Sequence, residues 1–426
     1  MNVSSTRARF ACVAVLVLGA TTGAPAAEDL QPSVPLSFEA AVARTLQGNP
    51  KLKGTAYRQR AADARIGQAR LRPAPELSLE VEDVLGTGVA QGFSGSQTTI
   101  AISQVLELGA QRERRVASAT AARELASTEA RAEALDVIAE MTRRYVEVAA
   151  AQERLALRER AVLLARRTTA GVQQRVDAAR APDVELHRAR IAQSRSELAR
   201  ENAEHELLSA RHLLSAQWGA VQPDFGRVTE DLYRMPEADD FEVLVQRLRT
   251  HPDFLRFVSE ARLRDAEVRL AESRRHAGIK VGAGVRRLQA SQDEAFVASI
   301  AVPLFGGSRA AAGVAEAEAQ RDLVGVEEQA AFVRTRAQLF ELYQELRHAR
   351  NETALLRDQV KPGLETVAKE AEYAYERGRY SYLEWTAAQA ELIDVEAALI
   401  EAAANAHRHL AEIERLTGEP LAAPQN

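Results

Sequence analysis

The segment Leu77-Ser78-Leu79-Glu80-Val81-Glu82 alternates strictly between apolar and polar residues. About 200 positions later, Ile279-Lys280-Val281-Gly282-Ala283-Gly284-Val285-Arg286 alternates in the same way. Alternation with a period of two is typical of a strand with one apolar and one polar face. Each segment is followed by a β-branched and apolar run, Thr99 to Leu106 and Ala295 to Leu304. The sequence therefore predicts four strands, at about 76–84, 98–107, 279–288 and 295–304.

A very long helix is predicted after each pair of strands. Residues 109–178 contain no proline and are rich in Ala, Glu, Arg, Leu and Gln, which favour a helix. Residues 308–377 have a similar composition. At ~1.5 Å per residue, each helix would be roughly 100 Å long. A turn and a shorter return helix are expected after each one, over 182–217 and 381–416.

The order helix, strand, strand, long helix, return helix occurs twice, which indicates an internal duplication. Three pairs of motifs recur: Asn49-Pro50 with His251-Pro252, Leu108-Gly109 with Phe305-Gly306, and Asp183-Val184-Glu185-Leu186 with Tyr382-Leu383-Glu384-Trp385. The first repeat is expected over 27–218 and the second over 239–418. Residues 219–238, which carry two glycines and two prolines, are expected to form a linker, and 419–426 a C-terminal tail.

The first 26 residues have the layout of a cleaved secretory signal peptide. Arg7 and Arg9 precede the apolar run Phe10 to Ala20, and Ala24-Pro25-Ala26 offers small residues for cleavage. The only cysteine, Cys12, lies in this segment, so the exported chain would have neither disulfides nor thiolate metal ligands. The net charge of −5 argues against a nucleic-acid partner.

Four strands are too few to close a barrel in a membrane, where about eight are needed. An open sheet edge in lipid would leave backbone groups unpaired at several kcal/mol each. Either the strands form a soluble sheet, or several subunits pool their strands into one barrel. Pooling accounts for the helices as well, because helices of this length would extend far beyond a ~30 Å hydrocarbon core.

Four charged residues are expected on the polar face of the strands: Glu80, Glu82, Lys280 and Arg286. In a barrel of pooled strands they would face a water-filled lumen rather than bind a specific ligand.

The local sequences resemble the outer membrane efflux proteins of the TolC type. Pro75 to Glu82, Ser103 to Gly109 and Val302 to Gly306 are similar to the cobalt–zinc–cadmium (CzcC-like) branch. The resemblance implies a mainly helical homotrimer with a twelve-stranded outer-membrane β-barrel, in contact with lipid, continued by a twelve-helix periplasmic α-barrel. Its partners would be a periplasmic adaptor (membrane fusion) protein and an inner-membrane pump of the resistance-nodulation-division (RND) class. Its cargo would be divalent heavy-metal cations.

The resemblance also implies a gate at the two helix turns. Tyr375 to Gly378, with Arg377 between them, resembles the Tyr-x-x-Gly motif that precedes the second turn. Asp183 stands where relatives carry a latch aspartate, although an acid after Pro182 is also common at a helix start. Tyr380 stands where the latch arginine would be, and Arg379 is the nearest substitute. Glu384 stands where relatives place an acidic ring in the pore, but it is also compatible with an ordinary solvated helix position.

No catalytic, cofactor or metal motif is found. His205-Glu206-Leu207-Leu208-Ser209 has a serine where a zinc protease needs its second histidine, and other histidines are scattered. There is no nucleophile elbow and no phosphate loop. The sequence therefore predicts a duct rather than an enzyme. The alternatives are a duct for organic drugs or other small molecules, and a periplasmic coiled-coil adaptor or scaffold.

Overall fold

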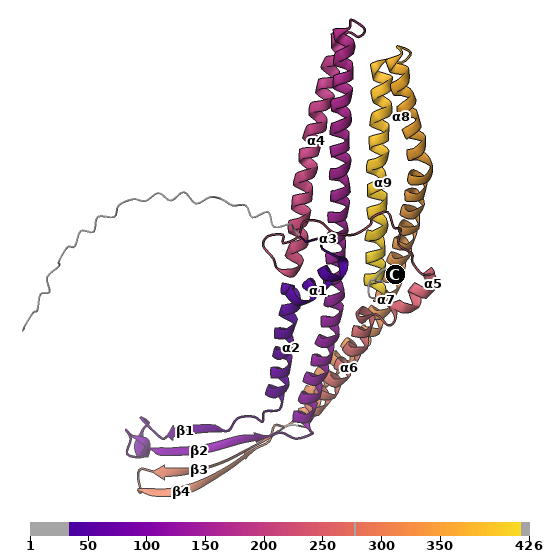
Figure 1. Ribbon diagram of the computed structural model, residues 1–426. Coiled ribbons are helices and arrows are strands. Elements are labelled where there is room, and N and C mark those ends of the chain that lie inside the picture. The colour runs from indigo at the N-terminus through magenta and orange to yellow at the C-terminus, as the bar shows by residue number, and fades with distance from the viewer. Residues whose placement is uncertain (1–33, 277, 419–426) are drawn as a thin grey trace, which may run out of the picture.

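The computed structural model describes residues 34–418, with the exception of residue 277 (Figure 1). Long helices extend from one end of a small four-stranded sheet, so the described chain is elongated. The expected signal peptide over residues 1–26 and the expected tail over 419–426 lie outside the described residues.

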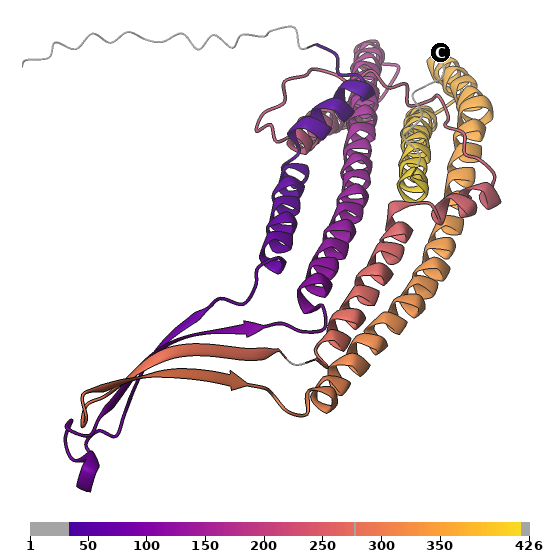
Figure 2. The same ribbon diagram turned by 90° about the horizontal axis from the view of Figure 1, so that it is seen from below.

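The four predicted strands are confirmed and form one antiparallel sheet in the order β1-β2-β3-β4. Their bounds are Glu76–Glu82 for β1, Gln97–Leu106 for β2, Ile279–Leu288 for β3 and Asp293–Ala301 for β4. The short 3-10 helix η1 (Gly88–Ala90) lies between β1 and β2. β4 begins two residues earlier than expected and ends before Pro303, which has no N–H to donate to a strand ladder. In Figure 2 the strands run away from the lower ends of the helices.

The central pair β2–β3 joins the two repeats. Its register runs from Gln97 opposite Leu288 to Leu106 opposite Ile279. Gly284 allows the two strands to approach closely, because a Cβ at this position would meet the Ile100 carbonyl oxygen and lie 2.6 Å from the Ala101 Cβ. One continuous sheet is therefore built from both halves of the chain.

Two hairpins of long helices form the bundle. The first consists of α3 (Gln111–Asp177) and α4 (Asp183–Ser215), and the 3-10 helix η2 (Ala216–Trp218) follows. The second consists of α7 (Gly306–Leu355), a π-helical segment η3 (Leu356–Val360), α8 (Lys361–Glu376) and α9 (Tyr382–Thr417).

The long helix predicted over 308–377 is present, but it contains the π-helical segment η3. Pro362 has no N–H to donate to the carbonyl of residue 358, and its ring would clash with that carbonyl. The wider π turn just before the proline removes the clash while the helix continues.

Two helices, not one, precede each pair of strands: α1 (Phe38–Gly48) and α2 (Pro50–Ala69), then α5 (Phe241–Leu248) and α6 (Pro252–Ser273). The matched motifs at their junctions act as N-caps. The side chain of Asn49 accepts a hydrogen bond from Lys51 N at 2.9 Å, and His251 Nδ1 accepts one from Asp253 N at 3.1 Å. A side-chain cap followed by proline therefore starts α2 and α6 alike.

The expected match of Leu108-Gly109 with Phe305-Gly306 has to be shifted by two residues in the first repeat. The left-handed residues that precede α3 and α7 are Ala110 (φ 58°) and Phe305 (φ 64°), so Ala110 is the structural counterpart of Phe305. The two repeats differ by a few residues in the length of their long helices, which a comparison of motifs alone does not reveal.

The segment expected to be a linker packs against the bundle. Val228 forms a parallel bridge with Leu36, and Phe225 and Leu232 are buried in the same hydrophobic cluster as Tyr145. Burial of these apolar side chains stabilises the segment against α3, so residues 219–238 do not act as a free tether.

The two hairpins meet along α3 and α9, an interface we call the α3–α9 seam (Figure 1). Small residues at its centre, such as Ala403 and Ala404, are fully buried and permit close packing. Polar pairs follow its length: Asp136–Arg415, Glu147–Arg408, Arg154–Glu401 and Thr168–Gln389. As the residue number rises in α3 it falls in α9, so the two helices are antiparallel.

None of the helices within the described residues is both long enough and apolar enough to span a membrane.

Candidate functional site

One face of the sheet is polar and carries all four of the predicted lumen residues. Glu80, Thr99 and Arg286 are neighbours across three strands. Arg286 donates to Thr99 Oγ1 at 3.0 Å and to Gln97 Oε1 at 3.1 Å, and it forms an ion pair with Glu82 at 3.0 Å. The polar positions of the first three strands are therefore linked through one guanidinium.

Lys280 lies on the same face and pairs with Glu76 at 2.6 Å. Glu76 was not predicted as a functional residue, although it continues the alternation of Ser78 and Glu80 by one step. The predicted sharing of one face is confirmed, and a role of these residues in a lumen stays a prediction.

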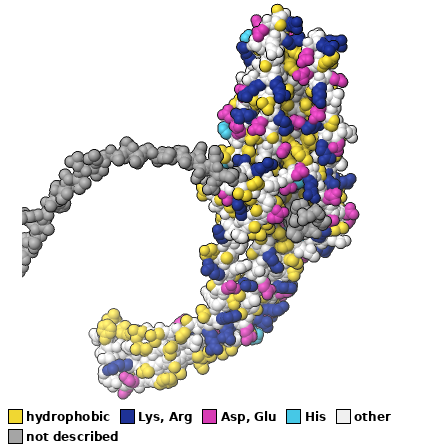
Figure 3. Space-filling view, viewed as in Figure 1, with side chains coloured by type: hydrophobic (Ala, Val, Ile, Leu, Met, Phe, Trp, Pro, Cys, Tyr) yellow, Lys and Arg dark blue, Asp and Glu magenta, His cyan; other side chains and the backbone are white. Residues whose placement is uncertain are grey.

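The opposite face of the sheet is apolar and exposed. Its large side chains are Leu77, Leu79, Val81, Ile100, Ile102, Val285, Phe296 and Ile300. Leu79 is 69% exposed and Phe296 is 76% exposed. The helices lie beyond the end of the sheet and cover neither face (Figures 1 and 2), and apolar side chains show on its surface in Figure 3. Apolar surface of this extent marks a membrane or protein interface.

The two helix turns lie together at the end of the bundle farthest from the sheet (Figure 1). In the second turn Gly378 adopts φ 71°, and Arg379 N donates to Ala374 O at 2.8 Å. In the first turn Ala179 adopts φ 55°, and Arg180 N donates to Arg175 O at 2.7 Å. Both turns close their helices in the same way, although a left-handed alanine costs about 1 kcal/mol more than a glycine.

A buried aromatic cluster holds the tips of the two hairpins together. Tyr375 stacks on Trp385 with ring centroids 4.7 Å apart, and Tyr382 meets the Trp385 ring edge-on at 6.5 Å. Val172 and Leu186 of the first hairpin pack into the same cluster. We call Val172, Leu186, Tyr375, Tyr382 and Trp385 the tip cluster. Such packing fixes the distance between the two turns.

Tyr375 also connects the hairpins through polar contacts. Its hydroxyl donates to Glu185 Oε2 at 2.8 Å, and Arg175 lies 4.6 Å over its ring. Arg175 donates to the carbonyl of Glu376 at 2.8 Å. Burial and the neighbouring Glu185 carboxylate raise the pKa of Tyr375 to about 12, so the hydroxyl remains a donor at neutral pH. Tyr375 was predicted from the sequence as a tip residue, whereas Arg175, Glu185 and Trp385 were not. Glu185 and Trp385 do belong to the repeated motif that begins at Asp183 and Tyr382.

The expected latch residues are not brought together within one chain. Asp183 is an exposed first-turn residue of α4 and makes no ion pair among the residues that the structure describes. Arg377 lies 4.3 Å over the ring of Tyr373, the structural role of Arg379 is its backbone bond, and Tyr380 is about half exposed. A latch that uses these groups stays a prediction.

Glu384 belongs to a capping box at the start of α9. Its Oε2 accepts from Ser381 N at 2.7 Å, and Glu384 N donates to Ser381 Oγ at 3.3 Å. The bond from the Ser381 backbone lowers the pKa of Glu384. The structure thus gives this carboxylate a local role at the helix start, and its role in a pore ring stays a prediction.

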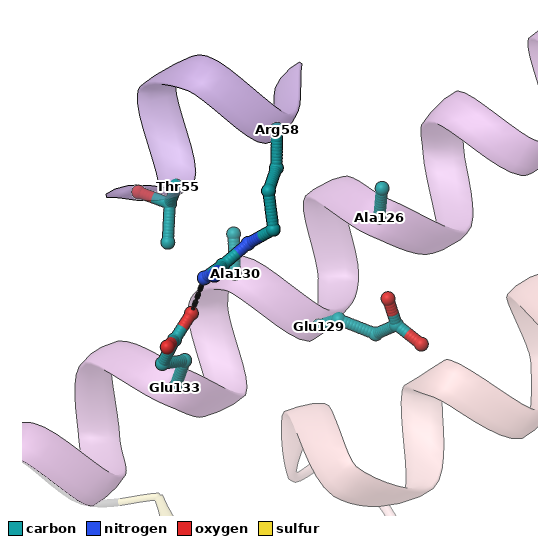
Figure 4. Close-up of a pocket in the computed structure, with 6 residues that line it drawn as sticks. All are labelled: Thr55, Arg58, Ala126, Glu129, Ala130 and Glu133. Carbon is teal, nitrogen blue, oxygen red and sulfur yellow. Dashed lines mark hydrogen bonds and ion pairs between the residues drawn. The ribbon is translucent and has the colours of Figure 1, made fainter. Parts of the chain in front are cut away.

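A shallow pocket between α2 and α3 does not have the chemistry of a cation site (Figure 4). Arg58 forms an ion pair with Glu133 at its centre, while Glu129 points away from this pair. Among the residues described, no three or more His, Cys, Asp or Glu side chains are grouped so that they could hold a metal ion.

Comparison with known proteins gives one consistent result. The family model of the outer membrane efflux proteins matches residues 41–220 and 243–419. The cobalt-zinc-cadmium resistance protein CzcC of Cupriavidus metallidurans is 28% identical over 384 residues, which cover 90% of each chain. The nickel-cobalt-cadmium resistance protein NccC of Alcaligenes xylosoxydans xylosoxydans is 26% identical over 75% of this chain and 73% of that protein. The crystal structure of CusC, which forms a transmembrane channel, has the same fold, with a TM-score of 0.71 and 15% identity over 90% of this chain and 92% of that chain.

Proposed function

The chain belongs to the outer membrane efflux protein family, and we propose its function on this basis. We infer that it is one subunit of an outer-membrane duct, that three copies complete the duct, and that the cargo is divalent heavy-metal cations. The observation that carries this proposal is the four-stranded sheet with two open edges, one exposed apolar face and one charged face.

Several chains must combine before such a sheet is stable in lipid. Within residues 34–418, the outer strands β1 and β4 each have one edge without a partner strand, and the backbone groups of such an edge would be unpaired in a bilayer. If β4 of one copy pairs with β1 of the next, three copies give a closed twelve-stranded barrel with the apolar face toward lipid. Glu80, Glu82, Lys280 and Arg286 would then line the lumen.

The α3–α9 seam supports the same conclusion for the helices. Leu186 and Trp385 occupy matching places in the tip cluster, which relates the two hairpins by an offset of 199 residues. With this offset, Thr168 on α3 corresponds to Val367 on α8, and Gln389 on α9 corresponds to Arg190 on α4. Thr168 and Gln389 are in contact, whereas Val367 and Arg190 are both exposed. We propose that α4 of one copy and α7–α8 of the next form a second seam of this kind.

We expect Arg190→Cys combined with Val367→Cys to give disulfide-linked multimers up to the trimer. The sequence has only one other cysteine, Cys12, in the expected signal peptide, so the background is low. The measurement is a non-reducing gel of the membrane fraction after mild oxidation, or after treatment with a short bis-maleimide.

Thr168→Cys combined with Gln389→Cys is the matched control, since these side chains lie 3.4 Å apart within one chain. This pair should cross-link inside the monomer only. The trimer proposal would be wrong if the control pair cross-links while the Arg190 and Val367 pair yields only monomers.

The metal cargo is proposed from the two resistance relatives, whose matches span most of this chain. A periplasmic adaptor and an inner-membrane RND pump would meet the tip with the two turns, and the pump would supply the energy. The expected signal peptide over residues 1–26 would direct export. Asp183, Arg377, Arg379, Tyr380 and Glu384 are the proposed gate and pore residues at the tip.

Deletion of the gene is expected to lower tolerance to cobalt, zinc or cadmium severalfold, because the cations would no longer leave the cell envelope. The measurement is the minimal inhibitory concentration of each metal, with the full-length gene restored on a plasmid as the control. Increased sensitivity to organic compounds alone would instead favour the second candidate function, a duct for drugs.

A further inference from the structure

A group of basic residues, most of them without acidic partners among the described residues, lies where the sheet meets the helices. Four segments come together there: 70–76, 107–115, 272–280 and 302–309. They contain nine Arg and Lys residues but only four Asp and Glu residues, a net charge of +5 in a chain whose total is −5. Dark-blue side chains gather at this junction in Figure 3. We call these four segments the junction belt.

Hydrogen bonds and an ion pair hold the first three segments together. Gln111 donates to the carbonyls of Ser273 at 3.3 Å and His276 at 2.8 Å. Arg115 donates to the carbonyl of Leu71 at 3.1 Å and pairs with Glu107. The fourth segment is joined to them because α7 packs against α6 just above the junction.

Seven arginines of the junction belt project into solvent. They are Arg70, Arg72, Arg112, Arg114, Arg274, Arg275 and Arg309. Among the residues that the structure describes, none of these guanidinium groups has a hydrogen bond or an ion pair. Elsewhere in the bundle many arginines are paired with acids, as Arg154 and Arg408 are in the α3–α9 seam.

Helix stability does not explain three of these arginines. Arg112 and Arg114 lie in the first turn of α3, and Arg309 lies in the first turn of α7. The N-terminus of a helix carries partial positive charge, so cations are unfavourable there and anions are favourable. These positions therefore add to a positive potential that suits a negatively charged ligand.

Exposed apolar side chains accompany the arginines. Leu71, Leu108, Leu304 and Phe305 belong to the junction belt, and Phe305 is 77% exposed. They lie in the connections between the strands and the helices. A surface that passes from apolar to basic over a few residues matches a bilayer, whose hydrocarbon region is bordered by phosphate groups.

We propose that the junction belt binds the phosphate groups of anionic phospholipids in the leaflet that faces the helices. This inference rests on the proposed function, because it requires the sheet to stand in the membrane. The lipid phosphates take the place of the missing acidic partners, and the apolar side chains enter the adjoining acyl region. The belt thereby sets the depth at which the sheet is held.

Native mass spectrometry of the detergent-solubilised full chain with phosphatidylglycerol or phosphatidylcholine tests the proposal. We expect the wild type to retain phosphatidylglycerol in preference. A basic residue near an anionic surface strengthens binding about fivefold, so Arg112→Gln, Arg114→Gln and Arg309→Gln together should weaken retention on the order of a hundredfold. The corresponding triple change to Lys should keep most of it.

The control is a triple change of exposed arginines outside the belt, two in helices and one in the turn after α3: Arg167→Gln, Arg334→Gln and Arg180→Gln. Equal loss in this control, or no loss in the belt variant, would overturn the proposal. Displacement of phosphatidylglycerol by inorganic phosphate, but not by chloride at the same ionic strength, would also overturn it and indicate a site for free phosphate. The cysteine pair at Arg190 and Val367 separates the two levels of inference: a trimer without lipid preference contradicts only the lipid proposal.

Discussion

Phe296→Arg is expected to reduce the amount of the protein in the outer-membrane fraction by more than about tenfold. Phe296 lies on the apolar face of the sheet, in a row with Leu79, Ile100 and Val285. An arginine on the lipid face of a membrane barrel costs about 2–4 kcal/mol near the midplane, and three copies multiply this penalty. The measurement is an immunoblot of fractionated membranes.

Ser299→Arg is the matched control on the same strand. Ser299 is exposed on the polar face opposite Gly282, where an arginine has room and would be directed toward water. This variant should assemble at close to the wild-type level. Equal assembly of both variants would show that the apolar face is not in contact with lipid, and the duct proposal would lose its main support.

Trp385→Ala is expected to loosen the tip of the bundle by about 3–5 kcal/mol, the usual cost of removing a large buried aromatic side chain. Trp385 is 5% exposed and contacts both Tyr375 and Tyr382. Amide protons near the two turns should then exchange on the order of a hundred to a thousand times faster, because local opening becomes easier. Amides near the base of α3 should be unaffected. Hydrogen–deuterium exchange of the full chain measures both.

Trp385→Leu is the control that the duplication itself provides, since Leu186 fills the matching place in the first hairpin. The leucine retains part of the buried area and should lose less protection than the alanine. Exchange rates at the turns that do not change in Trp385→Ala would contradict the role of the tip cluster in holding the hairpins together.

The strands and most helices were predictable because their signals are local. The alternation around Leu79 and Val281 directly reflects which side of a strand each residue faces. The break in the second long helix was also present in the sequence as Pro362, but how a helix accommodates a proline depends on the surrounding packing. The packing of the linker was not predictable, because its glycines and prolines do not reveal that Phe225 and Val228 are buried against α3.

The predicted site residues also differ in how far the sequence predicted their place in the structure. Glu80, Glu82, Lys280 and Arg286 follow from periodicity, and the sheet places all four on one face. Glu384 illustrates the opposite case. Its role in a pore ring rests on its place in a family motif and stays a prediction, and the structure adds that its carboxylate caps α9 through Ser381.

The strands, the long helices, their duplication and the two faces of the sheet could be predicted, because these depend on residue types a few positions apart. The contacts between side chains distant in the sequence became known only from the folded chain. Tyr375 reaches Glu185, and Thr168 reaches Gln389, over separations of 190 and 221 residues. Such contacts depend on the register of two packed helices, and one residue of shift would turn a contact side chain away from its partner.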